Sequence, residues 1–265
     1  MPMNPESELY ERIRSKKMLY GCGVESLHPA TTELAGMVGF DLVWGDLEHG
    51  AGSPNQVETF CIAAKAGGAL PIIRISFTDR THIMRALEAG ARLVAVPMVE
   101  TPEMAREIVE YGKYKPVGNR GFAGSTRGVR YGFTDPITSM AWANQETHLF
   151  PQIETAQALR RCAEIIGVEG ISGAVIGPAD LSISLGKPLK FDDPEVVAAV
   201  AEAIRITRSL GKIPILVSSH PALVRAAVEA GVQGLVCAGE RPSLKAVWTQ
   251  ALKDIQVVVS KSKVG

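Results

Sequence analysis

Short apolar runs alternate along the whole chain with longer stretches in which apolar residues recur at helical spacing. The runs LVAV and IPILV are apolar at every position, which is typical of strands covered on both faces in a parallel sheet. Repeated strand–helix units of this kind indicate an α/β fold. Eight strands are predicted, at residues 18–24, 41–45, 70–75, 93–97, 148–153, 171–176, 213–217 and 234–237, with helices between them such as 80–89, 102–111, 155–165, 194–209 and 221–230.

Two segments of the chain share one plan. MRALEAGARLVAVP around Gly90 and RAAVEAGVQGLVCAG around Gly231 each join an amphipathic helix that ends in Ala-Gly to a strand. Glycine readily adopts the left-handed conformation that ends a helix. This repetition, with no Ser/Pro/Gly-rich linker between halves, favours one closed (β/α)8 TIM barrel as a single domain over residues 1–265. An open doubly wound sheet is the alternative.

The charge balance and apolar content exclude several classes of protein. Among 265 residues, 28 are basic and 28 are acidic, so we expect no broad electrostatic grip on nucleic acid or on an anionic membrane. With 46% hydrophobic residues, the chain can bury a large core. Apolar runs fall short of the roughly 18 residues of a membrane span, and the polar first residues do not resemble a secretory signal. We therefore expect a cytoplasmic protein.

The four cysteines, Cys22, Cys61, Cys162 and Cys237, lie far apart without CxxC spacing. This spacing indicates neither a zinc knuckle nor a disulfide framework. All four are predicted to be small buried apolar residues.

Polar and ionisable side chains gather where the predicted strands end. In a (β/α)8 barrel, catalytic residues come from the carboxyl ends of the strands and from the loops that follow them. These positions hold residues 46–49 after the second strand, 74 at the third, 152–154 at the fifth, 177–180 after the sixth, 218–220 after the seventh and 239–241 after the eighth. The clustering predicts an active-site face, although strand ends are also polar wherever they meet solvent.

Glu154 and Asp180 are predicted to project from adjacent strand ends. Two carboxylates, completed by water and substrate oxygens, suit a hard cation such as Mg²⁺ or Mn²⁺. The alternative is that each carboxylate stabilises the start of the helix that follows it.

His49 is the candidate general base, because the ordinary pKa of histidine lies near neutrality. Asp46, Glu48 and Glu88 are the carboxylates available to orient its ring. Arg74 interrupts the apolar run PIIRIS, where an unpaired charge would be costly. It therefore implies an anionic partner, from the protein or from a substrate.

Residues 113–134 form a long segment rich in glycine and arginine, without helical or strand spacing. Loops of this length are usually functional or disordered, and after the fourth strand of a barrel this one would lie over the catalytic face. The sequence contains no P-loop, no GxGxxG after a strand and no GxSxG motif.

Several motifs together resemble one known family. FDLVWGDLEHG is similar to the strand-two motif of the HpcH/HpaI aldolases, the metal-dependent class II pyruvate aldolases, and the similarity continues through PIIRI, LEAGARLVAVPMVET, GNRGFAGSTR, FPQIETAQAL and GAVIGPADLSISLG. It spans roughly residues 8–255. The resemblance implies a (β/α)8 barrel, usually assembled as a hexamer of three dimers, that cleaves 4-hydroxy-2-oxo acids to pyruvate and an aldehyde.

The resemblance also implies a metal and a substrate site. Glu154 and Asp180 would bind the divalent metal, which would be Mg²⁺ or Mn²⁺, with Co²⁺ as a further candidate. The residues that would contact the substrate are Gln152, Gly177, Pro178 and Ala179.

Catalytic roles follow from the same motifs. His49 would remove the C4-hydroxyl proton of the substrate, and Arg74 would stabilise the metal-bound pyruvate enolate. Glu88 stands where the family usually has the aspartate that partners this histidine. Either Glu88 or Asp46 would therefore orient His49.

Two other functions stay open. The same residues would serve a decarboxylase or an enzyme that condenses the enolate with an oxo acid, and Arg127 and Arg130 are available for a carboxylated acceptor. The third reading is a barrel that binds oxo acids without catalysis. In each case we expect small-molecule ligands, no nucleic-acid or membrane partner, and a homo-oligomer.

Overall fold

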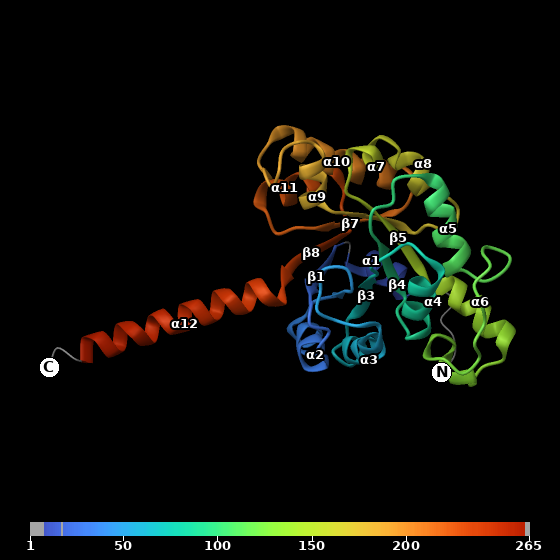
Figure 1. Ribbon diagram of the computed structural model, residues 1–265, viewed down its shortest axis with the longest axis horizontal. Helices are drawn as coiled ribbons and strands as arrows, with labels where there is room; N and C mark the ends of the chain where they lie inside the picture. The colour runs from blue at the N-terminus through green and yellow to red at the C-terminus, as the bar shows by residue number, and fades with distance from the viewer. Residues whose placement is uncertain (1–7, 17, 263–265) are drawn as a thin grey trace.

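Eight parallel strands close into a barrel in the computed structural model, which describes residues 8–16 and 18–262. Each strand pairs in parallel with the next along the chain, and the last pairs with the first (Figure 1). The strands are β1 (Leu19–Gly23), β2 (Leu42–Asp46), β3 (Leu70–Arg74), β4 (Leu93–Val96), β5 (His148–Ile153), β6 (Gly173–Ile176), β7 (Ile213–Val217) and β8 (Gly234–Gly239). The predicted (β/α)8 barrel is confirmed, and the open sheet is excluded.

Helices connect the strands and cover the outside of the barrel. They are α1 (Glu8–Lys16), α2 (Pro29–Val38), α3 (Val57–Ala66), α4 (Arg80–Glu88), α5 (Pro102–Gly112), α6 (Pro136–Glu146), α7 (Ala156–Arg160), α8 (Cys162–Gly167), α9 (Pro178–Ser184), α10 (Pro194–Ser209), α11 (Pro221–Ala230) and α12 (Glu240–Ser262), with short 3₁₀ turns η1 (Pro54–Gln56) and η2 (Arg127–Gly132). The single helix predicted over 155–165 is instead two, because Arg161 leaves the helical conformation at φ −105° and ψ 12°.

The barrel interior is closed at one end. Leu9 and Ile13 of α1 belong to the same buried cluster as Leu19, Leu42 and Leu70, the first residues of their strands. Helix α1 therefore packs against the amino ends of the strands. The carboxyl ends are left as the face at which a ligand can enter.

The long loop after β4 does not lie over this open face. Tyr131 donates a hydrogen bond to Glu58 of α3, and Arg92 donates one to the carbonyl oxygen of Gly128. Gly128 approaches α4 so closely that a Cβ there would lie 2.4 Å from the carbonyl oxygen of Leu87. These contacts hold the loop against α3 and α4, so its expected placement is wrong.

Helix α12 leaves the barrel instead of packing on it. Figure 1 shows it running away from the point where β8 ends, between α2 and α11. No residue of its 23 is buried. Because α12 does not cover the strands beside its first residue, side chains there are exposed to solvent; Tyr20 of β1 is 50% exposed.

Two further expectations concern cysteines and membranes. Cys61 and Cys162 are buried as predicted, whereas Cys22 and Cys237 are only partly covered; all four are free thiols. Within residues 8–16 and 18–262, no helix combines the length and the apolar character that a membrane crossing requires.

Candidate functional site

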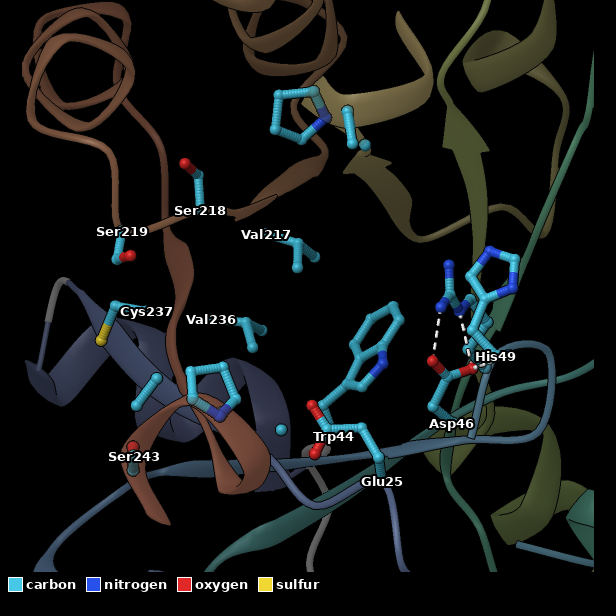
Figure 2. A pocket seen from close by; sticks show the side chains of 18 of the residues that line it. Glu25, Trp44, Asp46, His49, Val217, Ser218, Ser219, Val236, Cys237 and Ser243 are labelled. Carbon is cyan, nitrogen blue, oxygen red and sulfur yellow. Dashed lines mark hydrogen bonds and ion pairs between the residues drawn. The ribbon is translucent and has the colours of Figure 1, made fainter. Parts of the chain in front are cut away.

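A cavity of about 630 Å³ opens at the carboxyl end of the barrel. Side chains from the ends of β2, β3, β5 and β6 line one part of it, and those after β1, β7 and β8 line another (Figure 2). Most of the site residues predicted from the sequence border this space, namely Asp46, His49, Arg74, Gln152, Gly177, Pro178, Ala179 and Asp180. The strand-end clustering thus marks a real cavity.

Arg74 and Asp46 form a bidentate ion pair at the cavity wall. The Arg74 Nε and Nη2 atoms donate to Asp46 Oδ1 and Oδ2 at 2.9 and 2.5 Å, and Nη1 lies 2.9 Å from Glu48 Oε2. Asp46 Oδ1 also accepts the backbone N–H groups of Glu48 and His49. Burial would raise the Asp46 pKa, but the guanidinium outweighs it and holds the pKa below its usual range. The Arg74 charge is therefore fixed in position.

His49 lies at the cavity rim with its side chain 67% exposed. Its Nε2 atom is 3.9 Å from Glu48 Oε2, beyond hydrogen-bond distance. Asp46 binds the His49 backbone instead of its ring. Of the three carboxylates considered from the sequence, Glu48 is the one that the structure brings to the imidazole.

Glu88 lies elsewhere. It lines a separate cavity of about 360 Å³ with Arg85, Arg127 and Tyr131. The structure does not bring Glu88 to His49, so the expected pairing of these two side chains is not formed within the chain. Sequence position could not reveal this, because α4 turns the Glu88 side chain toward the loop after β4.

Glu154 lies just behind the cavity wall and is 2% exposed. Its Oε1 accepts the backbone N–H of Met98 at 2.7 Å, and its Oε2 accepts the side-chain amide of Gln152. Burial raises the pKa of Glu154 to about 7; the Met98 bond opposes this, and the charges of Glu48 and Asp180 add to it. The carboxylate thus lies where a nearby cation would stabilise its charged form.

Gly177 brings the β5 and β6 ends together. A Cβ at this position would lie 2.8 Å from Glu154 Oε2 and 2.9 Å from Gln152 Nε2. Asp180 follows in the first turn of α9, and its carboxylate borders the cavity. Neither carboxylate is a helix N-cap, because Thr155 caps α7 and Gly177 precedes α9.

The donor set fits a hard divalent cation. Glu154 and Asp180 offer carboxylate oxygens, and the buried amide oxygen of Gln152 has no hydrogen-bond partner among the described residues. Oxygen donors of this kind suit Mg²⁺ or Mn²⁺. No cluster of three or more His, Cys, Asp or Glu side chains was found in the described part of the chain, so water or substrate would have to complete the coordination.

In the other part of the cavity, Glu25 and Ser243 were not predicted from the sequence, whereas residues 218–219 were among the polar strand ends. Glu25 follows β1, and Cys237 and Ser243 lie at the end of β8 and the start of α12. Ser218 and Ser219 follow β7. Glu25 carried the same signal as Asp46, an ionisable residue just after an apolar strand, and could have been found by extending the strand-end survey to β1.

Comparison with known proteins identifies the family of the chain. The family model for HpcH/HpaI aldolase/citrate lyase matches residues 18–235. The chain is 37% identical over 229 residues to the hydroxypyruvate/pyruvate aldolase of Sagittula stellata, covering 86% of this chain and 90% of that protein. It is 35% identical over 246 residues to the 2-keto-3-deoxy-L-rhamnonate aldolase of Klebsiella pneumoniae, covering 91% and 88%.

Among solved structures, the chain is similar to an HpcH/HpaI aldolase from Desulfitobacterium hafniense. The TM-score is 0.86 at 27% sequence identity, and the match covers 94% of this chain and 96% of that one. The similarity therefore extends over the whole barrel.

Proposed function

The chain belongs to the HpcH/HpaI aldolase/citrate lyase family and is a carbon–carbon lyase, and on this premise we propose that it is a divalent-metal-dependent aldolase. Its reaction is the cleavage, or in reverse the formation, of a 4-hydroxy-2-oxo acid, with pyruvate and an aldehyde as products. The observation that carries this proposal is the Arg74 guanidinium, held by Asp46 and Glu48 at the wall of a cavity that Gln152 and Asp180 also line.

Glu154 and Asp180 are the residues that would hold the cation, Mg²⁺ or Mn²⁺, with Gln152 beside them. When bound, the cation supplies Lewis acidity that draws electrons toward the 2-oxo group of the substrate. Neither carboxylate is an N-cap, but Asp180 lies in the first turn of α9, where its charge also stabilises the start of that helix.

Arg74 stabilises the charge that the reaction creates. Breaking the C3–C4 bond leaves an enolate whose oxygen carries new negative charge. A guanidinium already held in place meets that charge without reorganising, and such preorganised donors typically contribute about 3 kcal/mol each. Both carboxylate partners of Arg74 belong to the protein, so its position does not depend on the substrate.

His49 removes the C4-hydroxyl proton in this proposal. Its ring borders the cavity and is accessible to solvent, so the proton can pass to water. Glu48 is the neighbouring carboxylate, with its Oε2 atom 3.9 Å from the ring Nε2. No described residue within hydrogen-bond distance fixes the ring, so substrate binding would have to orient it.

The other readings receive less support. Arg127 lines the cavity of Glu88, and the Arg130 guanidinium stacks on Trp142 at 5.7 Å. Neither borders the active-site cavity, so among residues 8–16 and 18–262 a carboxylated acceptor would find no arginine there besides Arg74. A binding protein without catalysis would not need the buried arrangement of Arg74, Asp46 and Glu48.

The test is pyruvate release from 4-hydroxy-2-oxoheptanedioate and 4-hydroxy-2-oxovalerate with Mn²⁺, Mg²⁺ or EDTA. We expect release that EDTA abolishes and Mn²⁺ restores, and that is lost in Glu154→Ala. The matched control is Glu100→Ala, which removes a carboxylate that accepts a hydrogen bond from Thr155 outside the cavity. Release that persists in EDTA would refute the metal dependence.

We also propose that the protein is a homo-oligomer in which two copies exchange α12. The residues at helical spacing that form the α12 apolar face are Leu244, Val247, Trp248, Leu252, Ile255, Val258 and Val259, and all are exposed. Burying a side chain of this kind contributes about 1.5–3 kcal/mol. An isolated chain would forgo most of that stabilisation.

A matching surface lies where α12 leaves the barrel. Leu34, Met37 and Val38 share one exposed face of α2, Val228 is exposed on α11, and Tyr20 is exposed on β1 between them. A (β/α)8 barrel normally covers such strand side chains with the helix after its last strand. The α12 of a second copy has the apolar face that this surface lacks, and reciprocal exchange satisfies both chains at once.

Light scattering after size-exclusion chromatography tests this assembly. We expect a mass at least twice the 28.3 kDa of one chain. Trp248→Glu should reduce it to one chain, whereas Lys253→Glu, on the opposite side of α12, should leave it unchanged. A wild-type monomer at micromolar concentration would refute the exchange.

A further inference from the structure

We infer that the β1–β8 side of the cavity selects a neutral aldehyde that carries hydroxyl groups, and that Glu25 binds those hydroxyls. This inference rests on the proposed aldolase function and names the class of its second substrate. Glu25, Ser218, Ser219, Cys237 and Ser243 are called the hydroxyl side of the cavity below.

Glu25 is placed on the cavity wall by the strands beside it. It follows β1 directly after Val24, and the order of strands puts β1 across the barrel from β5, which ends in Gln152. A Cβ at Gly239 would lie 3.2 Å from Glu25 Oε1, tighter than an ordinary contact. Glycine at the end of β8 therefore leaves room for this carboxylate.

The Glu25 carboxylate lacks the kind of hydrogen-bond partners that Asp46 has on the other side of the cavity. Its Oε2 is buried and accepts no hydrogen bond from the described residues. The neighbouring carboxylate of Glu240 differs, because it accepts hydrogen bonds from the backbone N–H of Ser26 at 3.0 Å and from the Ser26 hydroxyl at 2.7 Å. No described residue donates to the other oxygen of Glu25, Oε1, either, so a ligand in the cavity that donates a hydrogen bond there gives the carboxylate a partner.

The surrounding groups disfavour an anionic aldehyde. Arg74 and His49 are the cationic or titratable basic side chains among the described residues that line this cavity, and Arg74 is already paired with Asp46. A carboxylate on the aldehyde would therefore meet the negative charge of Glu25 without a free cation to offset it. Hydroxyl groups, in contrast, can donate to Glu25.

The serine hydroxyls complete the match. Ser218 Oγ accepts the backbone N–H of His220 at 3.1 Å, which leaves its own proton free to be donated. Ser219 and Ser243 also border the cavity, one after β7 and one in the first turn of α12. A three-carbon acid bound at the β5 and β6 ends fills only part of the 630 Å³. The rest of the space is lined by groups that exchange hydrogen bonds with a polyol.

The experiment measures aldol addition of pyruvate with Mn²⁺ to three aldehydes: glyceraldehyde, propanal and succinic semialdehyde. We expect the wild type to use glyceraldehyde at least about tenfold better, in kcat/KM, than either of the others. Glu25→Gln should lower kcat/KM for glyceraldehyde about tenfold and leave that for propanal unchanged. The matched control is Glu229→Gln, an exposed carboxylate on the outside of α11.

A second variant adds a charge without touching Glu25. Ser219→Lys places a cation on the exposed rim of the hydroxyl side and should raise kcat/KM for succinic semialdehyde about tenfold. Because this change lies at the surface, it tests the inference even if Glu25→Gln does not fold.

Deuterium exchange at C3 of pyruvate, followed without aldehyde, separates the two levels of the proposal. We expect Mn²⁺-dependent exchange at equal rates in wild type and in the control Glu229→Gln. Exchange that is intact while both variants keep the wild-type ranking of aldehydes would overturn the role of Glu25 alone. Absence of exchange in the wild type would instead overturn the aldolase function, and this inference with it.

Discussion

The two sides of the cavity differ in how their charged groups are satisfied. On the side formed by β2, β3, β5 and β6, Arg74 is held by Asp46 and Glu48, and both oxygens of Glu154 accept hydrogen bonds. On the hydroxyl side, Glu25 has a buried oxygen to which no residue in the described part of the chain donates. Groups that the protein fixes in advance suit the chemical step, which is common to all substrates. Groups left without protein partners suit the aldehyde, which differs between substrates. We therefore expect the first side to determine the rate of the chemical step and the hydroxyl side to determine which aldehyde is preferred.

Arg74→Lys, on the side formed by β2, β3, β5 and β6, should cause the largest loss of activity. Lysine keeps the charge but cannot form the bidentate contact with Asp46, so the cation is no longer held toward the enolate oxygen. We expect kcat to fall about 10²–10³-fold in steady-state assays of pyruvate release, with the ranking of aldehydes unchanged. The matched control is Arg85→Lys, which is exposed on α4. A kcat close to that of the wild type would show that Arg74 has only a structural role.

His49→Asn should cost less, about 10²-fold in cleavage, because solvent can replace part of a general base at an exposed position. Thermal shift with oxalate and Mn²⁺ should remain as in the wild type. His28→Asn, at an exposed position before α2, provides the control. Loss of the oxalate shift in His49→Asn would contradict a purely catalytic role.

Gly177→Ala disturbs the side formed by β2, β3, β5 and β6 without removing a charged group. The added methyl group would lie 2.8 Å from Glu154 Oε2, so the carboxylate or the Gln152 amide must move. We expect oxalate in the presence of Mn²⁺ to bind about tenfold more weakly by calorimetry. Gly167→Ala is the control, because a Cβ there meets no atom within 4 Å. Equal affinity in the two variants would argue against a metal site at Glu154.

Ser243→Ala should have the smallest effect, confined to the hydroxyl side. Ser243 borders the cavity but accepts and donates no hydrogen bond recorded among the described residues. We expect the KM for glyceraldehyde to rise about threefold, with the KM for pyruvate unchanged. Ser260→Ala, in the last turns of α12, is the control. A change in the KM for pyruvate would mean that the two sides are not separable.

The fold could be predicted because the barrel strands are short, apolar and bounded by glycine or by charge. Strand β5 and strand β7 begin and end where the sequence indicates, and the others deviate by one or two residues. Strand β6 begins later than predicted, since Ile171 forms only an isolated bridge with Leu149. Such ends depend on pairing with a neighbouring strand, which local pattern does not contain.

The sequence predicted which residues lie at the active-site cavity, but it did not predict which side chains contact one another there. The rule that barrel sites lie at strand ends placed Asp46, Arg74 and Gln152 at the cavity. It could not show that Asp46 would pair with Arg74 and leave the His49 ring to Glu48. These choices depend on side-chain geometry across strands that are distant in sequence.

The direction in which α12 leaves the barrel could not be predicted from the sequence either. Its apolar face predicts burial, but the sequence does not say whether the covering surface belongs to the same chain or to another. The structure shows the helix leaving its own barrel, and the first turns still line the cavity through Pro242, Ser243 and Ala246. Helix α12 thus contributes residues to the substrate cavity and also bears the exposed apolar face proposed to contact a second copy.

This double use of α12 ties the chemistry to the number of molecules present. If the position of the helix is set by a second copy, the shape of the cavity wall obeys mass action. Specific activity would then fall on dilution below the dissociation constant of the pair, and recovery after denaturation would be second order in protein. A cell could adjust such an enzyme more steeply than in proportion to its abundance.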